Sequence, residues 1–263
     1  MIDTNTKLPV IHHPQVTSGG NKTNRIRFVG ATLCSLYKGV LYFLSFSGPV
    51  VAVHHYRSLP VAVLLAFVIL GYGFAGVLFL SLLVLTRKVL IGSISCTGST
   101  TLDNEDAKKW FAAAMLMSIL VDSPFRPMTT GLSLFASPFY RGMGAAMPYS
   151  VLLGVRSRIT DPWFVELGEK VTIGGDAVIL GHLGHGDQIM LGRVIIGDGS
   201  IVGAKAVVFP DVRIGSRARI GAGAVVVRGT IVGDGETWAG VPARKISTRP
   251  ERTGLARAAN NGA

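Results

Sequence analysis

Histidines are the residues of this chain whose side chains could move a proton near neutral pH. The sequence has six, and His182 and His185 are the two that lie beyond residue 160. Imidazole has an unperturbed pKa of about 6.5, so either ring could take a proton from a hydroxyl or an amine. A carboxylate that holds the ring and stabilises its cation would improve the base. The surrounding elements must therefore supply that acid.

Several other kinds of chemistry find no support in the sequence. There is no G-x4-G-K-[ST] loop, no H-E-x-x-H and no nucleophile elbow. Nucleoside-triphosphate, metalloprotease and α/β-hydrolase chemistry are therefore not indicated. Cys34 and Cys96 have no zinc or redox spacing, which favours two buried or reduced thiols.

A six-residue repeat surrounds the two histidines. Small or β-branched residues mostly lie two positions before each repeated aliphatic or aromatic residue, and glycine often follows it. The repeated residues are Leu167, Ile173, Ile179, Ile196, Val202, Val208, Ile214, Ile220, Val226, Val232 and Trp238. Neither the helical period nor simple alternation explains this spacing. It predicts a parallel β-helix over residues 161–246, with about four coils of three hexads each.

The repeat changes phase at Gly184 to Arg193, which we expect to form a protruding loop beside His182. A coil of three hexads has 18 residues, and Glu166 lies 16 residues before His182. Glu166 could therefore lie one coil away on a similar edge and orient the ring. Asp176 and Asp187 are the alternatives.

The first third of the chain has two long apolar stretches. Residues 59–86 contain no charge, and about 20 helical residues cross a bilayer core. Residues 28–53 are also long enough, but they contain Lys38 and Pro49. We expect a transmembrane hairpin over residues 28–88. The alternative for its first half is an interfacial helix up to Lys38 followed by a short insertion.

Basic residues indicate the orientation of this hairpin. The net charge of the chain is +11, and +8 of it lies in residues 1–162, beside the apolar stretches. Four lysines and arginines precede the first span, Arg57 alone lies between the spans, and Arg87 and Lys88 follow the second. An integral protein of the inner (cytoplasmic) membrane with its C-terminal domain facing the cytoplasm is expected. We do not expect a nucleic-acid partner.

The remaining segments complete the predicted α + β chain. A polar leader is expected over residues 1–27, an amphipathic helical connector over 89–160 and a basic disordered tail over 247–263. Asp103 to Asp106 form a helix start before the apolar run that ends at Val121. A second helix is expected from Asp122 through Gly142.

Three features of the sequence point to a known family. They are the hexads, written [LIV]-G-x-x-[STAV]-x, the loop after Gly181-His182 and the ending Trp238 to Arg244. Together these features resemble the left-handed β-helix, or hexapeptide-repeat, acyltransferase superfamily over about a third of the chain. The hairpin, the connector and the entry segment from Asp161 to Gly168 are also similar to the membrane-tethered terminal module of polylysine-synthetase-type peptide synthetases.

The superfamily resemblance implies a site and its substrates. It implies His182 as the base, with His185 as the second choice, and acetyl-CoA or another acyl-CoA as the donor. Backbone N–H groups of Gly203 or Gly221 could then hold the thioester oxyanion. The terminal turn would lie near the coenzyme, with possible contacts from Trp238, Gly240, Arg244 and Lys245. The resemblance also implies a homotrimer.

The expected function is acetylation of a hydroxyl or an amine on a sugar, glycolipid or amino-acid-derived acceptor, at a membrane. One alternative is an amide-forming aminoacyl or peptidyl transferase with a carrier-bound donor, and another is a non-catalytic trimeric scaffold. A zinc carbonic anhydrase of the same fold needs three histidines, but the repeat offers only His182 and His185. We therefore expect no metal.

Overall fold

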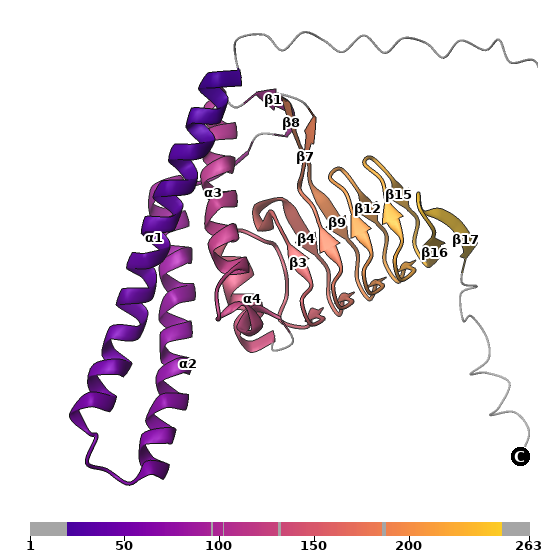
Figure 1. The fold of residues 1–263 in the computed structure, drawn as a ribbon. Coiled ribbons are helices and arrows are strands. Elements are labelled where there is room, and N and C mark those ends of the chain that lie inside the picture. The colour runs from indigo at the N-terminus through magenta and orange to yellow at the C-terminus, as the bar shows by residue number, and fades with distance from the viewer. Residues whose placement is uncertain (1–19, 96, 102, 131–132, 186–187, 249–263) are drawn as a thin grey trace, which may run out of the picture.

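Two long helices lie side by side, and a third packs between them and a stack of short strands (Figure 1). The computed structural model describes residues 20–95, 97–101, 103–130, 133–185 and 188–248. The helices are α1 (Gly20–His55), α2 (Val61–Thr86), the π-helix η1 (Arg87–Ile91), α3 (Glu105–Val121), the 3-10 helix η2 (Arg126–Thr129), α4 (Ser133–Gly142) and the 3-10 helix η3 (Pro162–Phe164).

The α1–α2 hairpin coincides with the two predicted apolar spans. Thr32–His55 and Val61–Ile91 are long and apolar enough to cross a membrane, by length and composition. Helix α1 begins at Gly20, inside the predicted polar leader, whose first 19 residues lie outside the described part. The Lys38 ammonium, which interrupts the first span, lies 3.8 Å from the Asp122 carboxylate at the end of α3.

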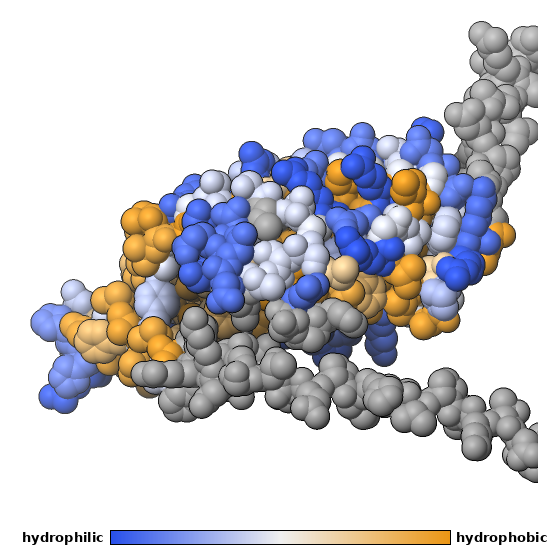
Figure 2. Space-filling model, turned by 90° about the horizontal axis from the view of Figure 1, so that it is seen from above, coloured by the Kyte–Doolittle hydropathy of each residue, from blue (hydrophilic) through white to orange (hydrophobic). Residues whose placement is uncertain are grey.

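The surface of the hairpin is apolar. Many of its large aliphatic and aromatic side chains are exposed, among them Phe43, Ile69 and Leu70, each more than 70% exposed. Figure 2 shows apolar surface gathered where the helices lie and mainly hydrophilic surface along the strands. An apolar face of this extent indicates a contact with lipid or with another protein.

Helix α3 begins where the sequence predicts. The Asn104 side chain accepts a hydrogen bond from the Asp106 N–H at 2.8 Å, which makes Asn104 the N-cap. The helix packs on α1, where the Cys34 thiol donates to the Met115 carbonyl at 3.6 Å. The predicted second helix is divided: η2 comes first, and α4 begins only at Ser133.

The C-terminal half is a parallel β-helix, as the hexads predict. Its three sheets run along the stack as strands β17-β16-β13-β10-β5-β2, β14-β11-β6-β3 and β15-β12-β9-β4. The strands of the first coils are β2 (Leu152–Leu153), β3 (Arg158–Ile159), β4 (Val165–Leu167), β5 (Thr172–Ile173), β6 (Val178–Ile179) and β9 (Val194–Ile196). The later strands are β10 (Ile201–Val202), β11 (Val207–Val208), β12 (Arg213–Ile214), β13 (Arg219–Ile220), β14 (Val225–Val226), β15 (Ile231–Val232), β16 (Glu236–Ala239) and β17 (Arg244–Thr248).

The hexad side chains fill the interior of this prism. Those from Leu167 to Val232 are at most 5% exposed, and the small residues that precede them, from Val165 to Ala224, are at most 1% exposed. Trp238, the last of the series, is half-buried beside Ile220. A narrow interior accepts only one large side chain per strand, which explains the six-residue spacing.

The sequence predicts that this domain starts at residue 161, but the first coil begins earlier, at β2. Strand β2 pairs with β5, and β3 pairs with β6. The interior residues Leu153 and Ile159 keep the six-residue spacing, but the next one is Leu167. Helix η3 lies in that interval and adds two residues to the coil, which hides the repeat in the sequence.

Both ends of the stack are covered. Helix α4 contacts β2 at one end, and the antiparallel pair β16–β17 closes the other. The predicted loop is a β-hairpin of β7 (His182–His185) and β8 (Gln188–Leu191), joined antiparallel by β1 (Gly98–Thr101) from the connector. The tail beyond Thr248 lies outside the described residues.

Candidate active site

His182 begins the hairpin and contacts a buried carboxylate. Its Nδ1 lies 2.7 Å from Oδ2 of Asp161. The His182 side chain is 32% exposed, whereas that of Asp161 is fully buried. Because the carboxylate accepts, Nδ1 carries the proton and Nε2 keeps its lone pair. This is the arrangement of an oriented general base.

Asp161 accepts three further hydrogen bonds. They come from Trp110 Nε1 at 2.8 Å, from the Gly181 N–H at 2.9 Å and from the Thr160 hydroxyl at 2.5 Å. Burial by itself would raise the pKa of Asp161, but the hydrogen bond and charge of His182, with the bonds from Thr160 and Trp110, hold it below its usual value. Asp161 is therefore an anion at neutral pH.

The same pair shifts the pKa of His182 in the opposite direction. Burial lowers the pKa of this ring, but the hydrogen bond and the charge of Asp161 outweigh it and leave the pKa above the usual 6.5. The raised pKa makes the neutral His182 ring a stronger base toward a hydroxyl or an amine.

The register of the coils brings Asp161 to His182. Ile159 of β3 lies beside Ile179 of β6, twenty residues later, so Asp161 lies beside Gly181. A Cβ atom at Gly181 would lie 2.7 Å from the Asp161 Cβ. Only glycine leaves room for the Gly181 N–H to reach the carboxylate, and His182 follows it directly.

Helix α3 forms one wall of the site. Trp110 on this helix is only 6% exposed, and its ring centroid lies 4.9 Å from that of His182 at an interplanar angle of 57°. The indole therefore contacts the imidazole and also donates to the acid that orients it. The connector is thus part of the site as well as a link to the hairpin.

A cavity of about 200 Å³ opens beside His182. Side chains of α3, η2, α4 and β3 surround it; the lining residues are Ala114, Met117, Ser118, Leu120, Val121, Arg126, Thr129, Tyr140, Ser157, Arg158, Ile159, Thr160 and His182. A small molecule in this cavity would lie next to the imidazole.

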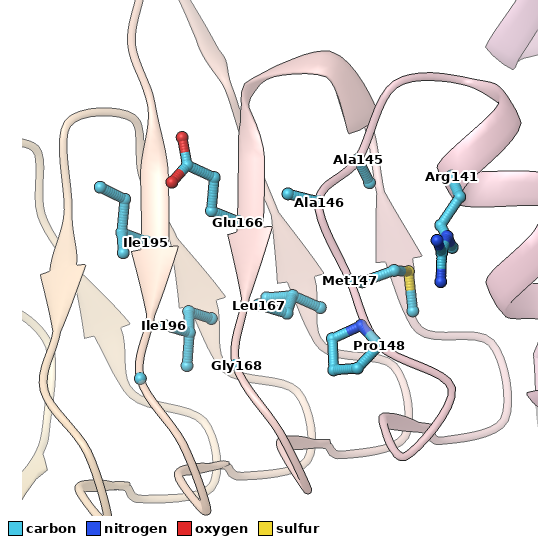
Figure 3. A pocket seen from close by; sticks show the side chains of 11 residues that line it. Arg141, Ala145, Ala146, Met147, Pro148, Glu166, Leu167, Gly168, Ile195 and Ile196 are labelled. Atoms are coloured by element: carbon cyan, nitrogen blue, oxygen red, sulfur yellow. The ribbon is translucent and has the colours of Figure 1, made fainter.

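Glu166, predicted to orient His182, does not reach it. Its Oε1 lies 2.7 Å from Arg193 Nη1, and Glu166 lies beside Ile195 on the sheet of β4 and β9, a different face of the prism from β3 and β6. Figure 3 shows Glu166 in a separate groove of about 660 Å³ together with Arg141 and Met147. The prediction failed because it assumed a coil of 18 residues, whereas the coil from β3 to β6 has twenty.

The other predicted residues near the base have different outcomes. Asp176 accepts two hydrogen bonds from Arg156, at 2.8 and 3.0 Å, in an exposed turn. Asp187 lies outside the described residues. The backbone of His185 pairs with Gln188 in the hairpin, but its side chain lies outside the described part.

The two predicted oxyanion donors are already occupied. The Gly203 N–H donates to the Ile220 carbonyl and the Gly221 N–H to the Trp238 carbonyl, both at 2.8 Å. A Cβ at Gly203 would lie 2.5 Å from the Ala222 nitrogen. These glycines therefore let neighbouring coils stack, and the prediction that their N–H groups hold an oxyanion is wrong.

The terminal turn is tied together by Glu236. This carboxylate accepts hydrogen bonds from Lys245 Nζ at 2.6 Å, Trp238 Nε1 at 2.8 Å and the Gly233 N–H at 2.8 Å. The bonds from Lys245, Trp238 and Gly233, in that order, lower the pKa of Glu236 to about 2. The Lys245 ammonium is therefore already paired with a carboxylate. The Arg244 side chain is exposed and, among the described residues, donates only to the Ala243 carbonyl. Gly240 has a φ of +95°, which favours glycine there.

Sequence reasoning missed Asp161 and Trp110. Asp161 could have been found by extending the hexad spacing back to Ile159 and Leu153, which reveals the longer coil. Trp110 had no such signal, because it precedes Asp161 by 51 residues and lies in a helix of another part of the chain.

No family model matches the chain. It is 34% identical over 102 residues to YvoF of Bacillus subtilis (strain 168), provisionally named an acetyltransferase, covering 39% of this chain and 58% of that protein. It is 35% identical over 94 residues to the UDP-3-O-acylglucosamine N-acyltransferase of Caulobacter sp. (strain K31), covering 36% of this chain and 25% of that protein.

Among solved structures, the chain resembles a maltose O-acetyltransferase from Clostridium difficile 630. The identity is 15% and the TM-score 0.45, over 59% of this chain and 94% of the other. The chain spans 58% and 25% of the two curated relatives that it matches, and what it shares with each is a stretch of about a hundred residues.

Proposed function

We propose that this chain is an acyltransferase that moves an acetyl group from acetyl-CoA to a hydroxyl or an amine, with His182 as general base and Asp161 as the residue that orients it. The observation that carries this proposal is the 2.7 Å contact between His182 Nδ1 and the fully buried Asp161. The matches to an N-acyltransferase and to a provisionally named acetyltransferase support it.

In this mechanism Nε2 of His182 takes the proton of the acceptor as its oxygen or nitrogen attacks the thioester carbonyl. The carbon–sulfur bond then breaks, and the imidazolium returns the proton to the departing thiolate. Asp161 stays ionised throughout and stabilises the imidazolium. The cavity beside His182 would hold the acceptor, and the exposed Arg244 could contact the phosphates of the coenzyme.

The test is thiol release from acetyl-CoA by the full-length protein with a panel of sugar, amine and amino-acid acceptors. We expect release that depends on an acceptor and falls at least about a hundredfold in His182→Ala, since general-base catalysis contributes about 10²–10⁴. Equal rates in both proteins would contradict the proposal. Transfer only from a carrier-bound donor would favour the aminoacyl or peptidyl alternative.

We also propose that the α1–α2 hairpin anchors the chain in the inner membrane, with the β-helix on the cytoplasmic side, and that the chain forms a trimer. The exposed apolar residues of the hairpin and the arrangement of basic residues support the anchor. The superfamily resemblance supports the trimer. We expect light scattering of the detergent-solubilised protein to give the mass of three chains, and the mass of one chain would contradict it.

A further inference from the structure

The cavity beside His182 has a composition that general-base chemistry does not require. One wall is apolar and comes from α3, with Met117, Leu120 and Val121. The lining also includes two arginines, Arg126 from η2 and Arg158 from β3. No aspartate or glutamate is among its described lining residues.

These two arginines have no carboxylate partner within the described part of the chain. Arg126 donates to the Arg156 carbonyl at 3.2 Å, and neither guanidinium takes part in the ion pairs there. Among the other arginines of the β-helix, Arg156, Arg193 and Arg228 pair with carboxylates. Arg213, Arg217 and Arg219 are in none of these ion pairs, but they do not line the cavity.

The neighbouring carboxylate does not neutralise them. Asp176 is bound by Arg156 through both of its oxygens. The pKa of Asp176 is lowered mainly by that hydrogen bond, and the charge of Arg126 contributes least. The cavity is therefore positively charged, and guanidinium groups are well suited to phosphate and carboxylate oxygens.

The size of the cavity limits what can enter it. Its volume of about 200 Å³ corresponds to roughly six or seven water molecules, at about 30 Å³ each. This is room for a phosphate or a carboxylate with a short chain. The larger part of a bigger acceptor must therefore lie outside.

From this juxtaposition we infer that the acceptor carries an anionic group, a phosphate or a carboxylate, which Arg126 and Arg158 bind, and an apolar group that lies against α3. The inference deepens the proposed function and rests on it, because only that function makes the bound molecule an acceptor. The anion would fix the molecule so that its hydroxyl or amine lies at His182.

Direct binding tests this without requiring the natural acceptor. Isothermal titration of the full-length protein in detergent would compare n-butyl phosphate with n-butanol and with inorganic phosphate. We expect butyl phosphate to bind at least tenfold more tightly than either, because it alone offers both an anion and a chain. Equal affinity for butyl phosphate and butanol would overturn the inference.

Substitutions then locate the binding site. Arg126→Gln and Arg158→Gln should each weaken butyl phosphate binding at least tenfold. Arg213→Gln is the matched control, because Arg213 of β12 is exposed and precedes a buried isoleucine, as Arg158 does in β3. Val121→Ser should weaken the binding of butyl phosphate but not that of inorganic phosphate. Butyl phosphate affinity that is unchanged in both Gln variants would overturn the inference.

Two further arms separate the possible results. His182→Ala should keep butyl phosphate binding and lose thiol release. If the wild type releases no thiol but still binds butyl phosphate through Arg126 and Arg158, the proposed function is rejected and the anion site is retained. Nanodiscs with and without phosphatidic acid distinguish the source of the anion. If phosphatidic acid competes with butyl phosphate, the anion is a lipid headgroup. If it does not compete, the anion belongs to a soluble acceptor.

Discussion

At the scale of single residues, the site depends on one buried carboxylate with four donors. Asp161 is ionised and fully buried, which is tolerable only because His182, Trp110, Thr160 and Gly181 all donate to it. Each donor also fixes the direction of the carboxylate, so the imidazole has one defined orientation.

Replacing this acid should change both the rate and its pH dependence. We expect Asp161→Asn to lower kcat about a hundredfold or more. In the wild type, kcat should rise with pH through the raised pKa of His182, because only the neutral ring is a base. Without the carboxylate, burial alone acts on the ring, so the rise should move to lower pH.

The control for this substitution is Glu166→Gln, which breaks the ion pair with Arg193 but leaves His182 untouched. It should keep the wild-type kcat and pH profile. A loss of activity in Glu166→Gln as large as that in Asp161→Asn, measured by thiol release, would contradict the assignment of the acid.

Gly181 lies so close to Asp161 that we expect this position not to tolerate a larger residue. A methyl group there would lie 2.7 Å from Asp161 Cβ and 3.1 Å from Phe164 Cβ, so Gly181→Ala should cost about 1–3 kcal/mol of unfolding free energy. Gly184→Ala is the control, since its Cβ would meet nothing within 4 Å. Denaturant unfolding of both variants checks this, and equal midpoints would refute it.

At the scale of elements, the connector completes the site. Helix α3 supplies Trp110 to the acid and base, and β1 joins the hairpin that carries His182. Thr100 lies beside Ile189, and Gly98 beside Leu191. The connector therefore provides the α3 wall of the cavity and the β1 strand beside the hairpin that carries His182.

We expect Trp110→Phe to affect the reaction through Asp161 and His182, which Trp110 positions. It keeps an aromatic ring against His182 but removes the donor to Asp161, which leaves more of the carboxylate charge acting on the imidazole. We expect kcat to fall several-fold, the KM for acetyl-CoA to stay unchanged and the rise of kcat with pH to move to higher pH.

Trp163→Phe is a matched control for this change. Trp163 is also buried, but its Nε1 has no hydrogen-bond partner within the described residues. The same substitution there should leave the pH profile unchanged. If both variants lose activity equally without a pH shift, Trp110 serves packing alone.

At the scale of the whole molecule, an apolar hairpin and a polar β-helix share one chain. Their junction is filled by α3 and α4, and Lys38 of α1 lies near Asp122 of α3. This geometry places the cavity beside the helices that we propose to be in the membrane, where a lipid-linked acceptor could reach it.

The anchor predicts a specific failure of insertion. Leu70 is 71% exposed on α2, so Leu70→Asp should make membrane insertion about 3 kcal/mol less favourable. Fractionation after alkaline extraction should then show less protein in the membrane pellet. Val155→Asp, at a residue 68% exposed on the β-helix, should leave the pellet unchanged, and a wild type found in the soluble fraction would reject the anchor.

The sequence by itself determined which side chains fill the prism and where the apolar helices lie, because both follow from short periods and long uniform stretches. It also predicted a protruding loop directly after His182, which the structure shows as a β-hairpin that begins at this residue. The tertiary structure decided which acid His182 meets, since η3 lengthens one coil and shifts the register from Glu166 to Asp161. It alone brought Trp110 to the site, because contacts between distant elements depend on how whole surfaces pack.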